Sequence, residues 1–133
     1  MINAEELRLG NYILAKTGIR ILPVKCDYIH FELLSKGGSK EIFPVVLKPD
    51  ILQKCGFIEN KKYALYPEAR EFILTLPVVG ENQNEIYVYI KNNKEVFGRA
   101  TMNKLPISNN FYHLHQLQNL YNALVGKELE INL

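Results

Sequence analysis

The sequence has no long apolar run, and its first residues do not resemble an export signal. No apolar stretch approaches the roughly 20 residues that a membrane-spanning helix needs. Met1 leads into Asn3, Glu5 and Glu6, whereas a signal peptide begins with a basic segment followed by an apolar one. We therefore expect a cytoplasmic protein without a membrane partner.

Cysteine is scarce, and the common catalytic motifs are missing. Cys26 and Cys55 are the only cysteines and form no C-x-x-C pair, so we expect two reduced thiols. The sequence also lacks the nucleotide-binding patterns G-x-G-x-x-G and G-x-x-x-x-G-K-S/T, the zinc motif H-E-x-x-H and the nucleophile motif G-x-S-x-G. These absences favour a non-catalytic role without a cofactor and leave an enzymatic role open.

Charge of one sign is not in large excess. The chain has 16 Lys and Arg against 14 Asp and Glu, which gives a net charge of +2. Residues 1–66 hold 10 of these cations and 7 of the acids, whereas residues 67–133 hold 6 and 7. DNA-binding proteins usually cluster cations on one face. The mildly basic first half is therefore only an alternative candidate for binding nucleic acid.

The pattern of apolar residues predicts an α+β fold in a single domain, residues 1–133. This length is typical of one domain, and no repeat or low-complexity tract divides the chain. Residues 7–47 predict mainly strands, and we expect them to form a small SH3-like β-barrel unit. The alternation of residues 19–34 changes phase near Asp27, which predicts a bulge or tight turn within a β-rich stretch.

A short helix and an antiparallel meander are predicted next. Pro49 suits a first helical turn and Gly56 a left-handed helix stop, so we expect a helix between them. Alternating residues and turn sequences then predict a meander. Its strands are expected at residues 62–66, 71–79, 85–91 and 95–102.

The clearest predicted element is a C-terminal helix that packs across the meander. Its apolar residues repeat at helical spacing. They are Leu114, Leu117, Leu120, Tyr121, Leu124 and Val125. Asn109 or Asn110 is a suitable N-cap, and Gly126 is a suitable stop. Residues 128–133 are a candidate closing strand.

The polar side of this helix is the predicted binding surface. His115, Gln118, Asn119 and Asn122 follow the spacing i, i+3, i+4 and i+7, which places them on one side of a helix. The set has amides and an imidazole but no charge, and amides can pair with backbone groups, bases or other amides. We predict contact with an unidentified protein partner. The alternative is an ordinary solvated face.

Two further functions remain open, and both depend on side chains elsewhere. Tyrosines in the meander, at positions 63, 66, 87 and 89, could stack nucleobases if their rings are exposed. Cys26 and His30 could be the thiol and base of a small hydrolase. His113 and His115 form an H-x-H pair, but positions i and i+2 of a helix point apart, an objection that weakens if the helix starts only after His113. Zinc needs about four ligands and no further Cys/His pair is nearby, so we predict no metal site.

Three stretches of the sequence combine into one pattern. They are Leu7-Arg8-Leu9-Gly10-Asn11, the segment 43–57 around Pro49-Asp50-Ile51-Leu52, and, most specifically, HQLQNLY at 115–121 followed by Ala123-Leu124, Gly126 and Glu128-Leu129. The pattern resembles a family of small proteins of unknown function from Bacteroidetes bacteria and their phages and mobile elements. Lys48 and Asn122 depart from it, because the family usually has threonine and often an aromatic residue there. The resemblance implies an accessory protein of phage or mobile-element origin and supplies no activity.

Overall fold

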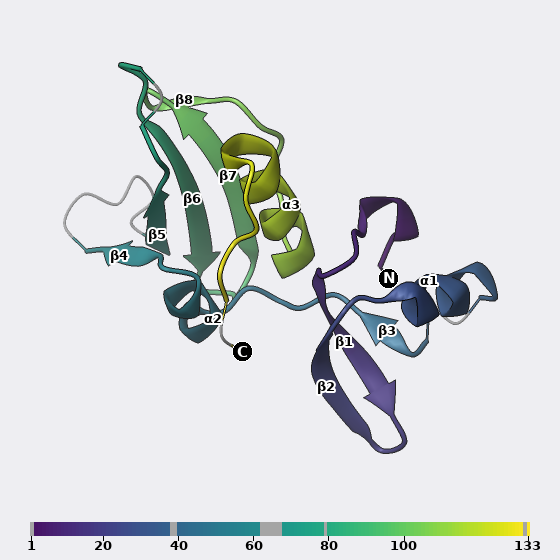
Figure 1. Ribbon diagram of the computed structural model, residues 1–133. Helices are drawn as coiled ribbons and strands as arrows, with labels where there is room; N and C mark the ends of the chain where they lie inside the picture. The colour runs from purple at the N-terminus through teal and green to yellow at the C-terminus, as the bar shows by residue number, and fades with distance from the viewer. Residues whose placement is uncertain (1, 38–39, 62–67, 79, 132) are drawn as a thin grey trace.

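The computed structural model describes residues 2–37, 40–61, 68–78, 80–131 and 133. It has an α+β fold with two antiparallel sheets and a C-terminal helix (Figure 1). The first sheet has the strand order β2-β1-β3 and the second the order β4-β5-β6-β7-β8. The elements are η1 (Ala4–Glu6), β1 (Tyr12–Thr17), β2 (Arg20–Lys25), α1 (Tyr28–Ser35), β3 (Ile42–Phe43), α2 (Pro49–Lys54), β4 (Ile58–Asn60), β5 (Ala69–Thr75), β6 (Asn84–Lys91), β7 (Val96–Met102), β8 (Leu105–Pro106) and α3 (Leu114–Val125).

The first sheet encloses a small apolar cluster of its own. β1 pairs with β2 along its full length and with the two-residue strand β3 on its other side. Ile13, Cys26 and Ile42 are buried there, and Phe31 and Leu33 of α1 pack against them. Among the described residues this sheet is open rather than closed, so the SH3-like barrel expected from the sequence is not confirmed.

The β-rich stretch predicted for residues 19–34 is wrong in its second half, because α1 begins at Tyr28. Asp27 is the N-cap: its side chain accepts a hydrogen bond from the Tyr28 backbone N–H at 2.7 Å. His30 completes a capping box by accepting from the Asp27 N–H at 2.9 Å. The phase change near Asp27 therefore marks a strand-to-helix boundary, not a bulge.

The second sheet is the larger of the two and confirms the predicted meander in outline. β5, β6 and β7 pair antiparallel in sequence order, with Val88 opposite both Phe72 and Gly98. The strand predicted at residues 62–66 lies outside the described residues. Residues 41–47, the last part of the predicted strand-rich unit, are expected from their sequence to form one strand; they contribute only β3 and an isolated bridge from Val46 to His113, so that expectation is wrong.

The short helix α2 has the ends that the sequence predicts. Pro49 occupies the first helical turn, and Gly56 has a φ of 94°, which is the left-handed conformation of a helix stop. The Phe57 N–H then bonds back to the Leu52 carbonyl at 3.0 Å. Leu52 and Phe57 are both buried in the large core.

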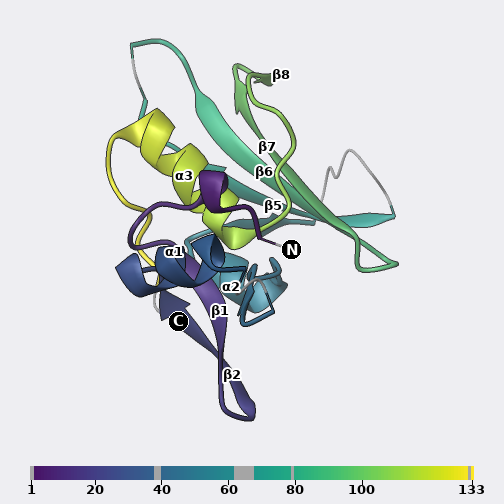
Figure 2. The same ribbon diagram turned by 90° about the vertical axis from the view of Figure 1, so that its right-hand side faces the viewer.

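α3 covers one face of the second sheet, as predicted (Figures 1 and 2). Leu114 and Leu117 are fully buried against the apolar side of the sheet. The predicted asparagine caps are wrong: His113 is the N-cap and forms a capping box with Gln116. No strand is assigned to the described residues of 128–133. None of the helices described has the length and hydropathy needed to cross a membrane.

A close backbone approach fixes the segment that leads into α3. Gly98 of β7 and Phe111 exchange two hydrogen bonds of 2.8 Å. The Phe111 ring covers Gly98, and a Cβ atom added there would collide with it. Only glycine therefore allows this segment to lie directly on β7.

Candidate functional site

The predicted binding face of α3 lies against the N-terminal segment of the same chain. Gln118 Oε1 accepts a hydrogen bond from the Tyr12 backbone N–H at 2.7 Å, and Asn119 Oδ1 accepts from Asn11 Nδ2 at 2.9 Å. His115 and Gln118 are only 1% and 2% exposed. These side chains therefore join α3 to β1 and to the residues before it.

Arg8 extends this network to the end of the chain. Its Nε donates to Asn119 Oδ1 at 2.7 Å, and its guanidinium pairs with the Glu128 carboxylate at 2.7 Å. Asn122 Nδ2 donates to the same carboxylate at 3.3 Å. A partner could reach the two buried members of the face only if the N-terminal segment moved away. Contact of this face with another protein stays a prediction.

The two histidines at the start of α3 are close together and desolvated. The rings of His113 and His115 lie nearly parallel with centroids 5.9 Å apart. The expectation that they point apart is therefore wrong, because His113 is the extended N-cap and not a helical residue. Burial lowers the pKa of His115, although Glu6, whose Oε2 is 3.4 Å from Nε2, partly opposes this effect. Burial first, and then the neighbouring His115, lower the pKa of His113. Both rings therefore favour the neutral form. In the described part of the chain, no three His, Cys, Asp or Glu residues are grouped to hold a metal.

Neither cysteine has the surroundings of an activated nucleophile. Burial, with a smaller effect of Asp27, raises the pKa of Cys26. Burial raises the pKa of Cys55 to about 12. A reactive cysteine needs a stabilised thiolate, and these shifts act against it. His30, the base considered for Cys26, uses its Nδ1 to cap α1.

A second group of polar residues lies on the face of the large sheet that α3 does not cover. Strand alternation directs Val88 of β6 toward the helix and Tyr87 and Tyr89 toward the opposite face. We call it the open face because α3 does not cover it. The register then sets Glu71 of β5 beside Tyr89, and Arg99 of β7 beside Tyr87. Aromatic and charged side chains are thus gathered on this face.

A pocket of about 480 Å³ lies in this open face. Its walls include Asn60, Glu71, Tyr87, Tyr89, Arg99 and Lys104. Glu71 is 3% exposed, and its carboxylate accepts hydrogen bonds from Asn60 Nδ2, at 2.8 Å, and from the Tyr89 hydroxyl. Burial, and then the Glu71 charge, raise the pKa of Tyr89. The phenol therefore keeps its proton and acts as a donor.

A tight turn brings Lys104 to the rim of this pocket. Asn103 and Lys104 have φ values of 51° and 72°, so the β7–β8 turn uses two left-handed residues. Lys104 Nζ donates to the Tyr87 hydroxyl and to Glu85 Oε1, both at 2.9 Å. The Tyr87 contact first, and Glu85 second, raise the pKa of Lys104. This ammonium group is already satisfied by protein acceptors.

Arg99, in contrast, has no hydrogen-bond or ion-pair partner among the described residues. Its Nε is buried without an acceptor. A guanidinium presents five N–H donors in a rigid fork and accepts nothing, and leaving such a donor buried and unpaired is unfavourable. Arg99 therefore gives the pocket an unmet requirement for an acceptor, which distinguishes it from the other cations nearby.

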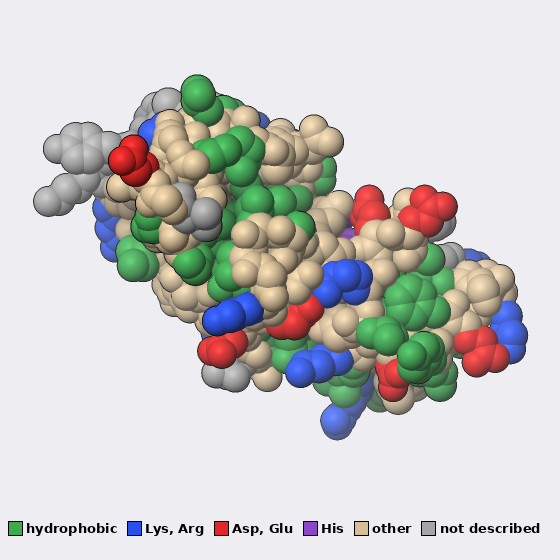
Figure 3. Space-filling model, turned by 45° about the horizontal axis from the view of Figure 1, so that its top comes forward, with side chains coloured by type: hydrophobic (Ala, Val, Ile, Leu, Met, Phe, Trp, Pro, Cys, Tyr) green, Lys and Arg blue, Asp and Glu red, His purple; other side chains and the backbone are tan. Residues whose placement is uncertain are grey.

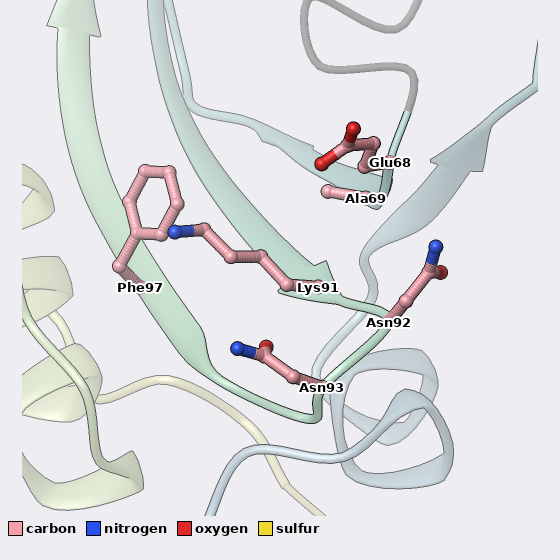
Figure 4. Close-up of a pocket in the computed structure, with 6 residues that line it drawn as sticks. All are labelled: Glu68, Ala69, Lys91, Asn92, Asn93 and Phe97. Carbon is pink, nitrogen blue, oxygen red and sulfur yellow. The ribbon is translucent and has the colours of Figure 1, made fainter.

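A neighbouring hollow of about 560 Å³ lies at the β6–β7 end of the same face (Figure 4). Lys91 extends along Phe97, with Nζ 5.6 Å from the ring centroid, and also pairs with Glu95 at 3.6 Å. Asn92 and Asn93 belong to the turn between β6 and β7 that borders the hollow (Figure 4). Its cation has partners, so this hollow is a weaker candidate than the Arg99 pocket.

Sequence reasoning found part of this site and missed its centre. The alternation of β6 separates Tyr87 and Tyr89 from the core-facing residues, which is correct. Glu71 and Arg99 carry no motif, and they join the tyrosines only through strand register. Tyr63 and Tyr66 lie outside the described residues. Tyr87 and Tyr89 are 8% and 3% exposed, which leaves little ring surface for stacking on bases.

Comparison of the chain with protein families, curated proteins and solved structures found no match. The resemblance to proteins of phages and mobile elements therefore stays a prediction. Function has to be inferred from the residues described above.

Proposed function

We propose that this protein is a non-catalytic binding protein and that the open face of its second sheet contacts a partner protein. Arg99 is the observation that carries the proposal, because its guanidinium lines a pocket and has no acceptor from the described chain. A carboxylate presents two oxygens that match this fork in a bidentate pair. The expected ligand group is therefore an acidic side chain or a C-terminal carboxylate of the partner.

The composition of this face supports a protein partner. Arginine and tyrosine are enriched among the residues that dominate binding energy at protein interfaces. Tyr87 and Tyr89 stack with ring centroids 6.2 Å apart, and Tyr89 and Phe97 with centroids 5.0 Å apart. These packed rings form a rigid surface beside Arg99. They would shield a charge-assisted bond between Arg99 and a partner carboxylate from water.

Nucleic acid is the weaker alternative at this face. Stacking needs accessible rings, and those of Tyr87 and Tyr89 are buried. The carboxylates of Glu71 and Glu85 lie on the same face and would repel phosphates. Charged side chains of both signs are also scattered over the side of the molecule shown in Figure 3. An accessory role in a phage or mobile element is compatible with a protein partner and belongs to the same proposal.

NMR can test the pocket before any partner is known. The Nε–Hε signals of Arg99 and of the exposed Arg20 are followed while sodium acetate is added at constant ionic strength. We expect a saturable shift of the Arg99 signal and only a small linear shift of the Arg20 signal. Inorganic phosphate, titrated in the same way, shows whether the site prefers a carboxylate. Equal, non-saturating shifts of both arginines would contradict the proposal.

A matched pair of variants then tests the protein partner. Wild-type protein, Arg99→Gln and Lys54→Gln, a control at an exposed position of α2, are immobilised at equal density and exposed to a bacterial lysate. The expected partner is retained by wild-type protein and by Lys54→Gln, and it is lost by Arg99→Gln. Its own acidic residues, replaced by amides, should give the same loss. Retention of every captured protein by Arg99→Gln would exclude Arg99 as the centre of the interface.

A further inference from the structure

The β1–β2 hairpin extends away from the rest of the molecule as an arm, as Figures 1 and 2 both show. Its apolar side chains are unusually exposed. Ile19 at the tip is 99% exposed, Ile21 is 52% exposed and Leu22 is 46% exposed. Exposed aliphatic side chains gathered at the end of an arm indicate a contact surface.

The arm is purely cationic. Lys16, Arg20 and Lys25 are its charged residues, and no Asp or Glu occurs between Leu7 and Cys26. None of these three side chains forms an ion pair with the rest of the described chain. Lys25 only approaches the Tyr12 ring, with Nζ 5.8 Å from its centroid. The arm therefore has uncompensated positive charge, and a polyanion is its complement.

The cations project from both faces of the arm. Lys25 pairs across the hairpin with Tyr12, which lies on the same side of β1 as Lys16, so Lys16 and Lys25 share a face. Arg20 pairs with Thr17 and therefore lies on the other face. An arm that binds a flat membrane surface needs its cations in one plane around the tip. A nucleic-acid groove has phosphates along both walls, which fits cations on both faces of a ribbon.

The free edge of β2 is not suited to adding another strand. Cys26 N–H bonds to the Asn11 carbonyl of the β1 side. Alternation then directs the N–H positions of residues 21, 23 and 25 outward. Position 23 is proline, which has no N–H and breaks a ladder on that edge. Edge pairing with an extended peptide is therefore disfavoured.

We propose that this arm binds duplex DNA by lying in the major groove. The groove is about 12 Å wide and admits a two-stranded β-ribbon. Lys16, Arg20 and Lys25 contact phosphates on its two walls, and Ile19 at the tip contacts thymine methyl groups on its floor. This site is separate from the sheet face around Arg99, so each proposal can fail without the other.

A salt titration measures the phosphate contacts. Fluorescence anisotropy of a labelled 20-base-pair duplex is recorded with the full chain from 25 to 200 mM NaCl. Three phosphate contacts predict a slope of about −2.7 for log Kobs against log salt, or about 40-fold weaker binding at 200 than at 50 mM. The absence of binding at 25 mM NaCl would overturn the proposal.

Variants assign the binding to the arm. Lys16→Ala, Arg20→Ala and Lys25→Ala should each reduce the magnitude of the salt slope by about 0.9. Lys54→Ala, an exposed lysine on α2, is the control and should leave the slope unchanged. If Arg99→Gln weakened DNA binding and none of the arm variants did, the DNA would bind the sheet face around Arg99, and the proposal would be overturned.

A second duplex and a tip variant test insertion into the groove. Double-stranded RNA of the same length has a deep, narrow major groove, so we expect it to bind more weakly than DNA. Ile19→Ser should weaken DNA binding without changing the salt slope, and circular dichroism should show an unchanged fold, because this side chain is 99% exposed. Equal binding of RNA and DNA, or no effect of Ile19→Ser, would overturn insertion. Binding to phosphatidylserine vesicles without binding to DNA would assign the arm to a membrane surface instead.

Discussion

α3 has two buried sides, and they hold the protein together in different ways. The side with Leu114 and Leu117 packs on the large sheet and is stabilised by removing apolar area from water. The side with Gln118 and Asn119 holds the N-terminal segment through directional hydrogen bonds. The first kind of contact requires volume and hydrophobicity, whereas the second requires particular atoms in particular places. Aliphatic substitutions should be tolerated better on the apolar side than on the amide side.

The largest effect is expected from a cavity on the apolar side. Leu117→Ala should lower the free energy of unfolding by about 2–5 kcal/mol, because Leu117 is fully buried. Urea denaturation followed by circular dichroism measures this change. Leu117→Met keeps the volume and should cost less than about 1.5 kcal/mol. Leu105→Ala, at a 70% exposed position, is the control for truncation itself.

A smaller effect is expected from the amide side. Gln118→Ala leaves the Tyr12 N–H without its acceptor, and an unpaired buried donor costs about 1–3 kcal/mol. Hydrogen exchange distinguishes the two sides of the helix. Protection of Ile13 in β1 should fall more than protection of Val88 in β6. An equal loss at both residues would mean that the two sides are not energetically separate.

The pH dependence of stability sharpens the same comparison. The pKa values of His113 and His115 are lowered in the folded protein, so the unfolded chain binds more protons near pH 6. Stability from these groups is complete above the unfolded pKa of about 6.5 and is lost as the pH falls toward the folded values. Urea midpoints at pH 7.5, 6.5 and 5.5 should therefore decrease. The effect should be smaller than that of Gln118→Ala, because Glu6 attracts the proton. A His115→Gln variant should show a flatter profile, and an equally steep one would contradict this assignment.

The smallest effect on stability is expected on the open face of the sheet. Arg99 makes no hydrogen bond or ion pair with the described residues, so Arg99→Gln should change the free energy of unfolding by less than about 0.5 kcal/mol. Thermal denaturation beside the NMR titration separates stability from binding. A large loss of stability would show that Arg99 supports the fold rather than a ligand.

Local rules predicted the elements with strong local signals. α3 has a long apolar repeat and a glycine stop, and the pattern alone located its end at Gly126, whereas the predicted cap at Asn109 or Asn110 placed its start three or four residues too early. α2 has proline and glycine at its ends. α1 was missed because Phe31 and Leu33 also fit strand alternation, while its capping box uses Asp27 and the imidazole of His30 rather than the usual pair.

The candidate site was less accessible to sequence reasoning, because it depends on tertiary contacts. The spacing of Gln118 and Asn119 shows that they share a helix side, but not that residues 8–12 cover this side. Arg99 and Glu71 are 28 positions apart in the sequence and join one pocket through the pairing of β5, β6 and β7. No local rule specifies that pairing.

The bonds between the amide side of α3 and the N-terminal segment join residues 106 to 113 positions apart in the chain. During synthesis, Arg8 and Asn11 leave the ribosome well before Asn119 is translated. Until then the backbone N–H of Tyr12 lacks Gln118 as its acceptor, and the small first sheet is not held against α3. Contacts of such long range slow folding. A nascent chain arrested before residue 114 should therefore be cut by proteases within its first 30 residues, and release of the complete chain should restore resistance.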